Sequence, residues 1–500
     1  MNRNRLKSGS VTLVSVLAFM LVAGLLFTML EAGRFREMEK VAKMQTDAAI
    51  ESLFANYEPT LWEEYHFLAV EAGDSRTDSF EQRETYLKDL LEESMGGFFT
   101  ATVQNLELDH YIYVTDQKGA AFQSAATAYM ENNFAYEFYR QISQLSEGIE
   151  ELKEEDLDEY VGEAQDLIEA AESEAETESG TTQKPRILTG YKLSNPNQYQ
   201  SNTQSETPLD VADEINATGL MCMVLPPGTK VSGKSIDLAQ AVSKRERKNG
   251  SGDTIATGFY QTIATEAYLS TYFSSYTNPI KTHGMEYELE YILCGFERDQ
   301  SNLNASIAAL IGVRELANFG YLLTDTKKCS EAEAIASGIA IAIFQPELIE
   351  PIKYGILASW AMAESVMDVR ALLQGKKIAL IKNSAQWSSD LSNLISIFDT
   401  ETISQDCENG FDYQTYLLAL LLLKSSEKRS LRALDLMEAT VREQENRADF
   451  CIDHCLIETG LAVSYRYHSV FWGMDILTKD FEGDFFVEGV SKYSYRKAGA

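Results

Sequence analysis

Four residues between positions 228 and 235 have the types and spacing of a P-loop, the segment that binds nucleotide phosphates. They are Gly228, Gly233, Lys234 and Ser235. In a P-loop the backbone amides surround the phosphates, the lysine neutralises them and the serine binds magnesium. Here prolines occupy positions 226–227, where the entering strand should end, and no apolar strand ending in aspartate supplies a second magnesium ligand. We therefore predict an ordinary glycine-containing turn, with nucleotide binding as the alternative.

A second group of residues has the ligand types of a zinc site. Cys451, His454 and Cys455 offer the sulfur and nitrogen atoms that zinc prefers, and His468 could complete the set. The surrounding sequence predicts a strand, which would separate the two cysteine Cα atoms by about 13 Å. That separation is too long for one metal ion without a bulge, so we predict no metal centre.

A third group consists of two carboxylates on an expected helix. Glu364 and Asp368 are four residues apart and share a face, a spacing that suits a metal ion or paired carboxylates for acid–base chemistry. Arg314, Arg370 or a lysine at 376–377 could equally pair with them as structural ions. No histidine pair or Ser-His-Asp set lies near them in sequence. We favour structural ion pairs and predict no catalytic residue, no cofactor and no enzymatic activity.

Composition and charge restrict the class of protein. The chain has 500 residues, of which 45% are hydrophobic, enough for two or three globular domains. It carries 43 basic and 76 acidic residues, a formal net charge of −33. This charge disfavours nucleic-acid binding, and the short basic cluster at 244–248 is too small to change that expectation. Six scattered cysteines are too few for a disulfide scaffold.

The N-terminal region contains a long uncharged segment. No charged residue lies between Lys7 and Glu31, and residues 11–30 are predominantly apolar. As a helix this segment would span about 30 Å, the thickness of a bilayer core. It exceeds the apolar core of a signal peptide and lacks a small-x-small exit. We predict an uncleaved anchor that follows a cytoplasmic tail, residues 1–9, and continues as a stalk helix within residues 10–57.

Several sequence blocks around this anchor are familiar in combination. They are Gly9-Ser10-Val11-Thr12, the sequence Glu31-Ala32-Gly33-Arg34 at the membrane exit, and Leu61-Trp62-Glu63-Glu64-Tyr65. Together they resemble an uncharacterised membrane-anchored family found with tight-adherence (Tad/Flp) pilus genes of Gram-positive bacteria, distantly similar to TadE and TadG pseudopilins. Glu31, Gly33 and Arg34 match the exit motif of TadE proteins. The resemblance implies pilus or pseudopilin proteins as partners of the N-terminal helix, and no known activity.

The remaining chain divides by composition into three regions. Residues 58–146 predict a small α+β region with a strand at 106–114, whose alternate residues from Leu106 through His110 to Val114 would share a face. Residues 147–208 predict an acidic helix followed by a flexible linker. Residues 209–500 predict a helix-rich domain.

Apolar periodicity predicts the elements of this last domain. Helices are expected at 302–323, 330–344, 347–374, 413–423 and 427–443. Strands are expected at 287–294, 377–381, 451–467 and 484–495. The apolar run 334–344 predicts a buried core helix because it is too short to cross a membrane. The expected fold class is therefore α+β and mostly helical.

These observations favour a single-pass membrane protein with its large domain outside the cytoplasm. Its expected role is that of a structural or assembly component of a Tad/Flp-type pilus, in which the helix 10–56 packs laterally against similar helices. Ala23 and Gly24 would allow close approach. Two alternatives stay open: a membrane-anchored enzyme, through the 228–235 loop or a metal-dependent hydrolase site, and a passive cell-surface binding module.

Overall fold

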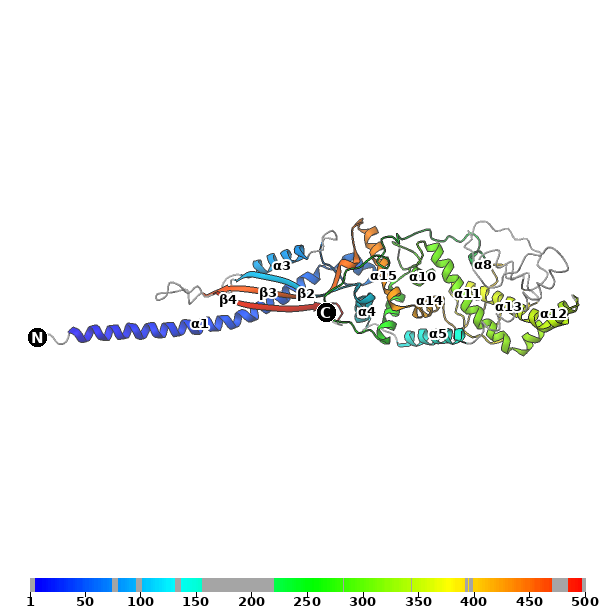
Figure 1. Cartoon of the computed structure of the whole chain (residues 1–500), viewed down its shortest axis with the longest axis horizontal. Helices are drawn as coiled ribbons and strands as arrows, with labels where there is room; N and C mark the ends of the chain where they lie inside the picture. The colour runs from blue at the N-terminus through cyan, green and yellow to red at the C-terminus, as the bar shows by residue number, and fades with distance from the viewer. Residues whose placement is uncertain are drawn as a thin grey trace. The chain divides into compact units, whose positions relative to one another are not determined.

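The computed structural model consists mainly of helices, with one antiparallel sheet (Figure 1). This confirms the predicted α+β, mostly helical class. The structure describes residues 5–73, 80–95, 101–130, 136–154, 220–281, 283–342, 344–391, 394, 399–469 and 484–496. The predicted acidic helix and linker lie largely outside these residues.

The chain forms two compact units that are not consecutive in sequence. Unit 1 comprises Met1–Tyr129, Glu246–Thr257 and Arg447–Ala500, and unit 2 comprises Met130–Arg245 and Gly258–Asn446. This differs from the predicted series of consecutive segments. The reason is that the sheet of unit 1 takes strands from both ends of the chain, whose residues are far apart in sequence.

Helix α1, Arg5–Ala55, begins unit 1 and is unbroken over 51 residues, as predicted for the anchor and stalk. Side chains of residues 11–30 are exposed except for the half-buried Ala23, whereas from Glu31 onward one side of the helix is buried. The buried stripe recurs every three or four residues and includes Met38, Ala42, Thr46, Ala49 and Leu53. The first half of α1 is long and apolar enough to cross a membrane, a property that signal sequences share.

The sheet of unit 1 is organised around β3, Cys455–His468. This strand pairs antiparallel with β1, Val70–Glu71, with β2, Ala101–Tyr113, and with β4, Asp484–Ser494. Helix α3, Glu81–Ser94, contributes to the same hydrophobic core. Between β1 and α1 lies the short helix α2, Pro59–Tyr65.

The strand predictions for unit 1 are confirmed with two corrections. β2 begins five residues earlier than predicted and is interrupted by bulges, so His110 is exposed with a φ of 46° and does not share the buried face of Leu108 and Ile112. The predicted strand 451–467 starts instead with a 3-10 turn, Ile452–His454, before β3 begins.

The second half of α1 packs closely on the sheet, with β4 alongside it (Figure 1). Thr46 Oγ1 lies 2.9 Å from the hydroxyl oxygen of Tyr465 on β3. The ring of Phe54 contacts Tyr493, with ring centroids 4.7 Å apart. Gly489 on β4 faces Thr46, and a Cβ at this position would overlap the threonine hydroxyl. A glycine is therefore needed where helix and strand approach most closely.

A short segment of the chain returns from unit 2 to unit 1. The amide of Gly250 donates to Asp116 Oδ1 over 2.9 Å, and the amides of Ser251 and Gly252 donate to the carbonyl of Tyr111. Asp116 opens helix α4, Asp116–Met130, whose first turn contains three consecutive residues with positive φ. The segment thus fastens to the junction between β2 and α4.

Unit 2 is helical. Its helices are α5 Tyr136–Glu154, α8 Leu220–Val224, α9 Phe259–Tyr272, α10 Glu288–Cys294, α11 Asp299–Thr324, α12 Thr326–Ala342, α13 Ile349–Leu373, α14 Tyr413–Leu422 and α15 Ser426–Gln444. The five predicted helices of this unit are confirmed. α11 is also long and apolar enough to cross a membrane, but half of it is buried within the protein, as in a core helix.

Three predictions for unit 2 are wrong. Residues 287–294 form α10 instead of a strand; their alternating apolar pattern is misleading because residues 288–293 are buried on all sides, and Gly295, with φ of 76°, ends the helix. Residues 377–381 form only an isolated bridge between Ile378 and Phe411. The apolar end of α12 is buried on one face only: Ala336 and Ala340 are fully buried, but Ile341 is 66% exposed and Phe344, beyond the helix, is 91% exposed.

Substituting Gly489 by alanine is expected to destabilise unit 1, because the added Cβ would overlap Thr46 Oγ1 and would also lie 3.1 Å from the carbonyl oxygen of Ala42. Overpacking of this kind costs about 1–3 kcal/mol. Hydrogen exchange of the β3 and β4 amides in the detergent-solubilised chain measures the loss. The control is Val490→Thr, at a 62% exposed position of the same strand; equal protection in the two variants would contradict the close approach.

Candidate functional site

The predicted membrane-exit motif lies where α1 changes from an exposed helix to a buried one. Glu31 and Arg34 are 3% and 4% exposed, although every residue from 11 to 30 is more accessible. Arg34 Nη1 donates to Glu31 Oε1 over 2.9 Å and to the carbonyl of His468 over 3.0 Å. Gly33 is exposed, and a Cβ there would meet no atom within 4 Å.

The sheet supplies the other side of this junction. His468 is the last residue of β3, and its Nδ1 lies 2.7 Å from Asp484 Oδ1 at the start of β4. Hydrogen bonds from Arg466 hold the pKa of Asp484 below its usual value. The helix spacing of three residues brings Glu31 and Arg34 to one side, where the His468 carbonyl at the end of β3 accepts a second hydrogen bond from Arg34 Nη1.

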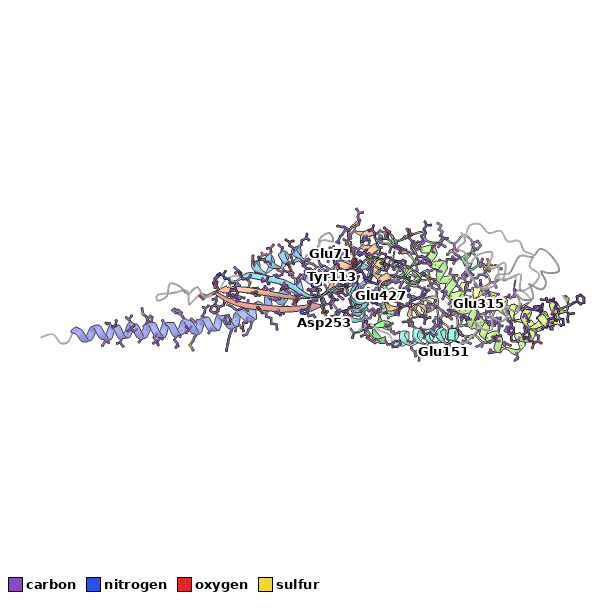
Figure 2. All side chains as sticks on the ribbon, in the orientation of Figure 1. Glu71, Tyr113, Glu151, Asp253, Glu315 and Glu427 are labelled. Atoms are coloured by element: carbon purple, nitrogen blue, oxygen red, sulfur yellow. The ribbon has the colours of Figure 1, made fainter. Side chains whose placement is uncertain are left out.

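This junction is suited to attachment and not to bond-making chemistry. The charges of Glu31 and Arg34 compensate each other, and the arginine ties α1 to a strand that is 434 residues away in sequence. The exposed apolar half of α1 is therefore anchored to the folded part of unit 1 at its last turn. Figure 2 shows that the side chains of this half stand clear of the other described elements of unit 1.

The residues of the P-loop match lie in a loop with different surroundings from a P-loop. Residues 220–224 before it form helix α8 instead of a strand, and no helix follows it within residues 225–257, which the structure describes without a gap. Ser232 Oγ donates to Asp299 Oδ2 over 2.6 Å, and Lys234 Nζ lies 3.7 Å from Glu286 Oε1. The first contact attaches the loop to the first residue of α11, and the second attaches it to the segment just before α10.

The other matched positions of this loop take part in the same arrangement. Gly228 has a φ of +83° in a turn, which favours glycine, while a Cβ at Gly233 would meet no atom within 4 Å. Ser235 forms an isolated β-bridge with Arg298. The positive φ thus accounts for the first glycine, whereas the bridge at Ser235 is formed by backbone atoms and does not depend on a serine side chain.

The residues of the possible zinc site are only partly brought together. Cys451 precedes the 3-10 turn that contains His454, and Cys455 begins β3. The thiol of Cys455 donates to the carbonyl of Cys451 over 3.9 Å. His468 lies at the opposite end of β3, about 40 Å away for a strand of this length, so it cannot complete a site with these three residues.

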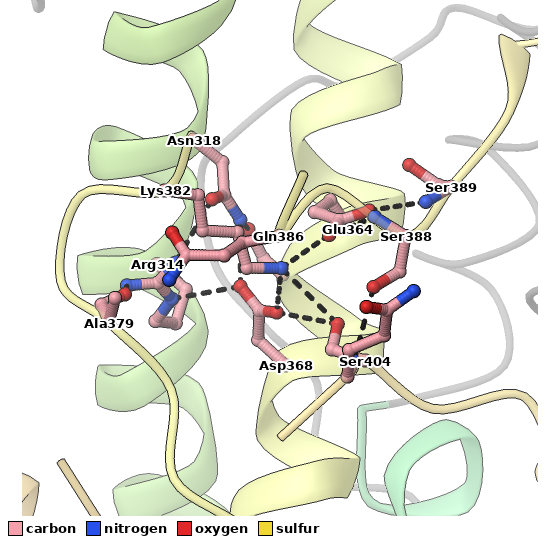
Figure 3. A network of polar contacts seen from close by, with 12 residues as sticks. Arg314, Asn318, Glu364, Asp368, Ala379, Lys382, Gln386, Ser388, Ser389 and Ser404 are labelled. Atoms are coloured by element: carbon pink, nitrogen blue, oxygen red, sulfur yellow. Dashed lines mark hydrogen bonds and ion pairs between the residues drawn. The ribbon is translucent and has the colours of Figure 1, made fainter. Parts of the chain in front are cut away.

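Glu364 and Asp368 lie in a fully buried network of ions (Figure 3). Arg314 Nε donates to Asp368 Oδ2 over 2.9 Å, and Lys382 Nζ pairs with both Glu364 Oε1 and Asp368 Oδ1. Two cations and two anions therefore balance within the core. Burial by itself would raise the pKa of Asp368, but the charges of Arg314 and Lys382 outweigh it and hold this pKa below its usual value.

The sequence predicted only one of the two cations that pair with these carboxylates. Arg314 is one of the predicted partners, whereas Arg370 donates to backbone carbonyls, among them that of Met223 over 2.6 Å. The buried lysine is Lys382 and not a residue of 376–377. One feature of the sequence could have indicated that Lys382 is buried: it is the one charged residue in the stretch 378–387. The loop that carries it lies between α13 and α14, where the sequence predicts only a short strand, 377–381, that does not form.

Other carboxyl groups of unit 2 are also buried, which sequence periodicity did not reveal. Glu290 on α10 accepts a hydrogen bond from the Tyr413 hydroxyl over 2.8 Å, and its burial raises its pKa to about 7. Glu315 on α11, labelled in Figure 2, is half-buried, and the partial removal of its carboxyl group from water raises its pKa to about 7 as well. Such groups are protonated more easily than surface carboxylates.

Comparison with known proteins assigns the chain to a family. A family of unknown function, DUF5702, matches residues 198–467, which is more than half of the sequence. The protein belongs to the DUF5702 family. No curated protein and no solved structure matches it. The matched residues include the buried network around Asp368 and all of β3 except His468, but neither α1 nor β4.

The buried pair at the start of the α1–sheet contact can be tested in this DUF5702 protein. Arg34→Met should cost about 3–5 kcal/mol because it leaves the Glu31 carboxylate buried without its partner, and adding Glu31→Gln should recover part of that loss. The measurement is the free energy of unit 1 opening, obtained from hydrogen exchange of the β3 amides.

A matched control lies on the same helix. Lys40 pairs with Glu37 over 2.9 Å at the same spacing of three residues, but both side chains are more than half exposed. Lys40→Met should therefore change the free energy by less than about 1 kcal/mol. An effect of Arg34→Met as small as this would show that the buried pair does not hold α1 to the sheet.

Proposed function

We propose that this protein is a membrane-anchored, extracytoplasmic structural or assembly component of a Tad/Flp-type pilus, acting in the manner of a pseudopilin. The observation that carries the proposal is the division of α1 into two halves. Residues 11–30 present apolar side chains on all sides, and the residues from Glu31 onward pack on the sheet. One continuous helix thus joins a membrane-compatible surface to a folded domain.

The exposed half of α1 is suited to packing against other helices in a bilayer. Its large side chains project freely, with Phe19 73% and Leu21 72% exposed. Lipid is as apolar as these residues, so helix association in a membrane depends on close van der Waals packing, which small residues allow. A Cβ at Gly24 would meet no atom of this chain within 4 Å, which leaves that side available to a neighbouring helix.

The junction at Glu31 and Arg34 supports the same role. Its hydrogen bond to the His468 carbonyl joins the end of the apolar segment to the central strand of the sheet. A displacement of the membrane segment would therefore be transmitted to the sheet. The similarity of Glu31, Gly33 and Arg34 to the membrane-exit motif of TadE pseudopilins is what favours a pilus over other membrane assemblies.

Replacing both Ala23 and Gly24 by isoleucine should reduce co-purification of this protein with pilus components at least several-fold, because bulky side chains prevent close helix approach. The substitution at Gly24 meets no atom of the chain itself, so the monomer should fold normally. Pull-down from detergent-solubilised membranes of the native host measures the effect.

The control for this experiment is Ala48→Ile, the same enlargement as at position 23, made at an exposed position of α1 outside the apolar segment. It should leave co-purification unchanged. Unaltered co-purification of the double variant would contradict lateral packing through this face.

The extracytoplasmic location makes a separate prediction. Protease added to intact, wall-stripped cells should digest the region after Pro208, as followed with an antibody to that region. A cytoplasmic marker protein should survive the same treatment. Protection of the region in these cells would place it in the cytoplasm and contradict the proposed location.

A further inference from the structure

Three reactive groups meet in the core of unit 2 with no access to solvent. The amine of Lys382 contacts one oxygen of Glu364 and one oxygen of Asp368, and all three side chains are 0% exposed. An amine, a carboxyl group and a second carboxylate that can move protons are the groups needed to form an amide. We propose that Lys382 and Asp368 condense into an intramolecular isopeptide bond, with Glu364 as the proton-transferring base.

The position of the base is set by its backbone partners. Glu364 lies one helical turn before Asp368 on α13, so both carboxyl groups face Lys382 (Figure 3). The amide of Ser388 donates to Glu364 Oε1 over 2.9 Å, and the amide of Ser389 donates to Oε2 over 2.7 Å. These bonds hold the carboxylate against the lysine amine.

The two oxygens of Asp368 have different hydrogen-bond partners, which suit one oxygen to remain in the amide and the other to leave as water. Oδ2 accepts hydrogen bonds from Arg314 Nε over 2.9 Å and from Asn318 Nδ2 over 3.0 Å. These donors would stabilise the negative charge that develops on this oxygen when the amine attacks. Oδ1 contacts Lys382 and accepts from Ser404 Oγ over 2.6 Å, so it is the oxygen that leaves.

The condensation balances in atoms and charge. The Lys382 ammonium gives one proton to Glu364, which passes it to Asp368 Oδ1. Because this transfer removes the lysine charge, one of the two charges that keep Asp368 ionised is lost, and a neutral amine faces a neutral carboxylic acid. The amine attacks Cγ of Asp368 and forms the new C–N bond. Glu364 transfers a second proton from the nitrogen to Oδ1, and the C–Oδ1 bond breaks to release one water molecule. Glu364 ends as a carboxylate, and no oxidant or reductant is needed.

Burial favours the product over the starting ion pair. Charges taken out of water carry a large desolvation cost that their mutual attraction offsets only in part. The amide replaces one buried cation and one buried anion by a neutral group and leaves the Arg314 and Glu364 charges to balance each other. The Trp387 ring, 6.0 Å from the lysine nitrogen, forms part of the surroundings that separate the site from water.

The bond would tie α13 to the loop that follows it. Residues 374–412 contain little regular secondary structure among the described positions, yet Lys382 lies in the middle of the core. A covalent link from Asp368 to Lys382 would keep this loop in place when the unit is under mechanical load. The inference does not rest on the proposed pilus function, since the chemistry is contained within one chain.

The test is the intact mass of the full-length chain after purification and denaturation. We expect a mass lower than that of the sequence by one water molecule. Trypsin should then give residues 354–370 linked to 378–424, because the modified Lys382 is no longer cleaved. A full sequence mass, with residues 378–382 recovered as a separate unlinked peptide, would overturn the proposal without any variant.

Variants identify the participating groups. Lys382→Arg keeps the charge but should abolish the mass loss, and Glu364→Gln should abolish or slow it at least tenfold while Lys382 and Asp368 remain in place. Lys377→Arg, at an exposed lysine of the same loop, is the matched control and should retain the full mass loss. Undiminished condensation in Glu364→Gln would overturn the role of Glu364 as base.

Discussion

The packing of the second half of α1 on the antiparallel sheet is the constraint on which unit 1 depends. The sheet takes β2 from the first part of the chain and β3 and β4 from its last part. A sheet needs a partner layer for its apolar face, and α1 provides it through the stripe that includes Ala42, Thr46 and Leu53. The contact can be close only because Gly489 lacks a side chain.

This packing has a consequence for the apolar segment that precedes it. α1 continues without a break from residue 5 to residue 55, so the exposed half cannot reorient independently of the half that is bound to the sheet. The Arg34 hydrogen bond to the His468 carbonyl fixes the helix at the point where burial begins. Whatever the first half of α1 binds is thereby coupled mechanically to the folded domain, which is the property that an assembly subunit needs.

Unit 2 depends on a different balance, between burial and charge. Arg314 is fully buried and donates not only to Asp368 but also to the carbonyls of Ala379 and Leu380. It thus satisfies backbone groups of a loop that has almost no secondary structure to satisfy them. The charged side chains that hold this irregular segment in the core include the two groups required for a covalent link. They are the amine of Lys382 and the carboxylate of Asp368, which contact each other.

The sequence by itself determined the elements whose signal is local. The uncharged run 11–30, the absence of proline before Pro59 and the helical periodicity of 302–323 and 347–374 were sufficient for α1, α11 and α13. The spacing of Glu364 and Asp368 likewise predicted that the two carboxylates share one face of a helix. These features depend on residues within a few turns of each other, where backbone geometry alone sets the spacing.

Only the tertiary structure decided which distant residues meet. Residues 287–294 alternate like a strand but are buried on all sides, so period alone could not distinguish a short strand from a helix. The choice of Lys382 over residues 376–377 depended on the path of a loop without periodicity. Strands β2, β3 and β4 could be predicted singly, whereas the two-residue β1 was not predicted. Their joining into one sheet across more than 300 residues required α1 to cover them, because long-range pairing is set by shared burial and not by local sequence.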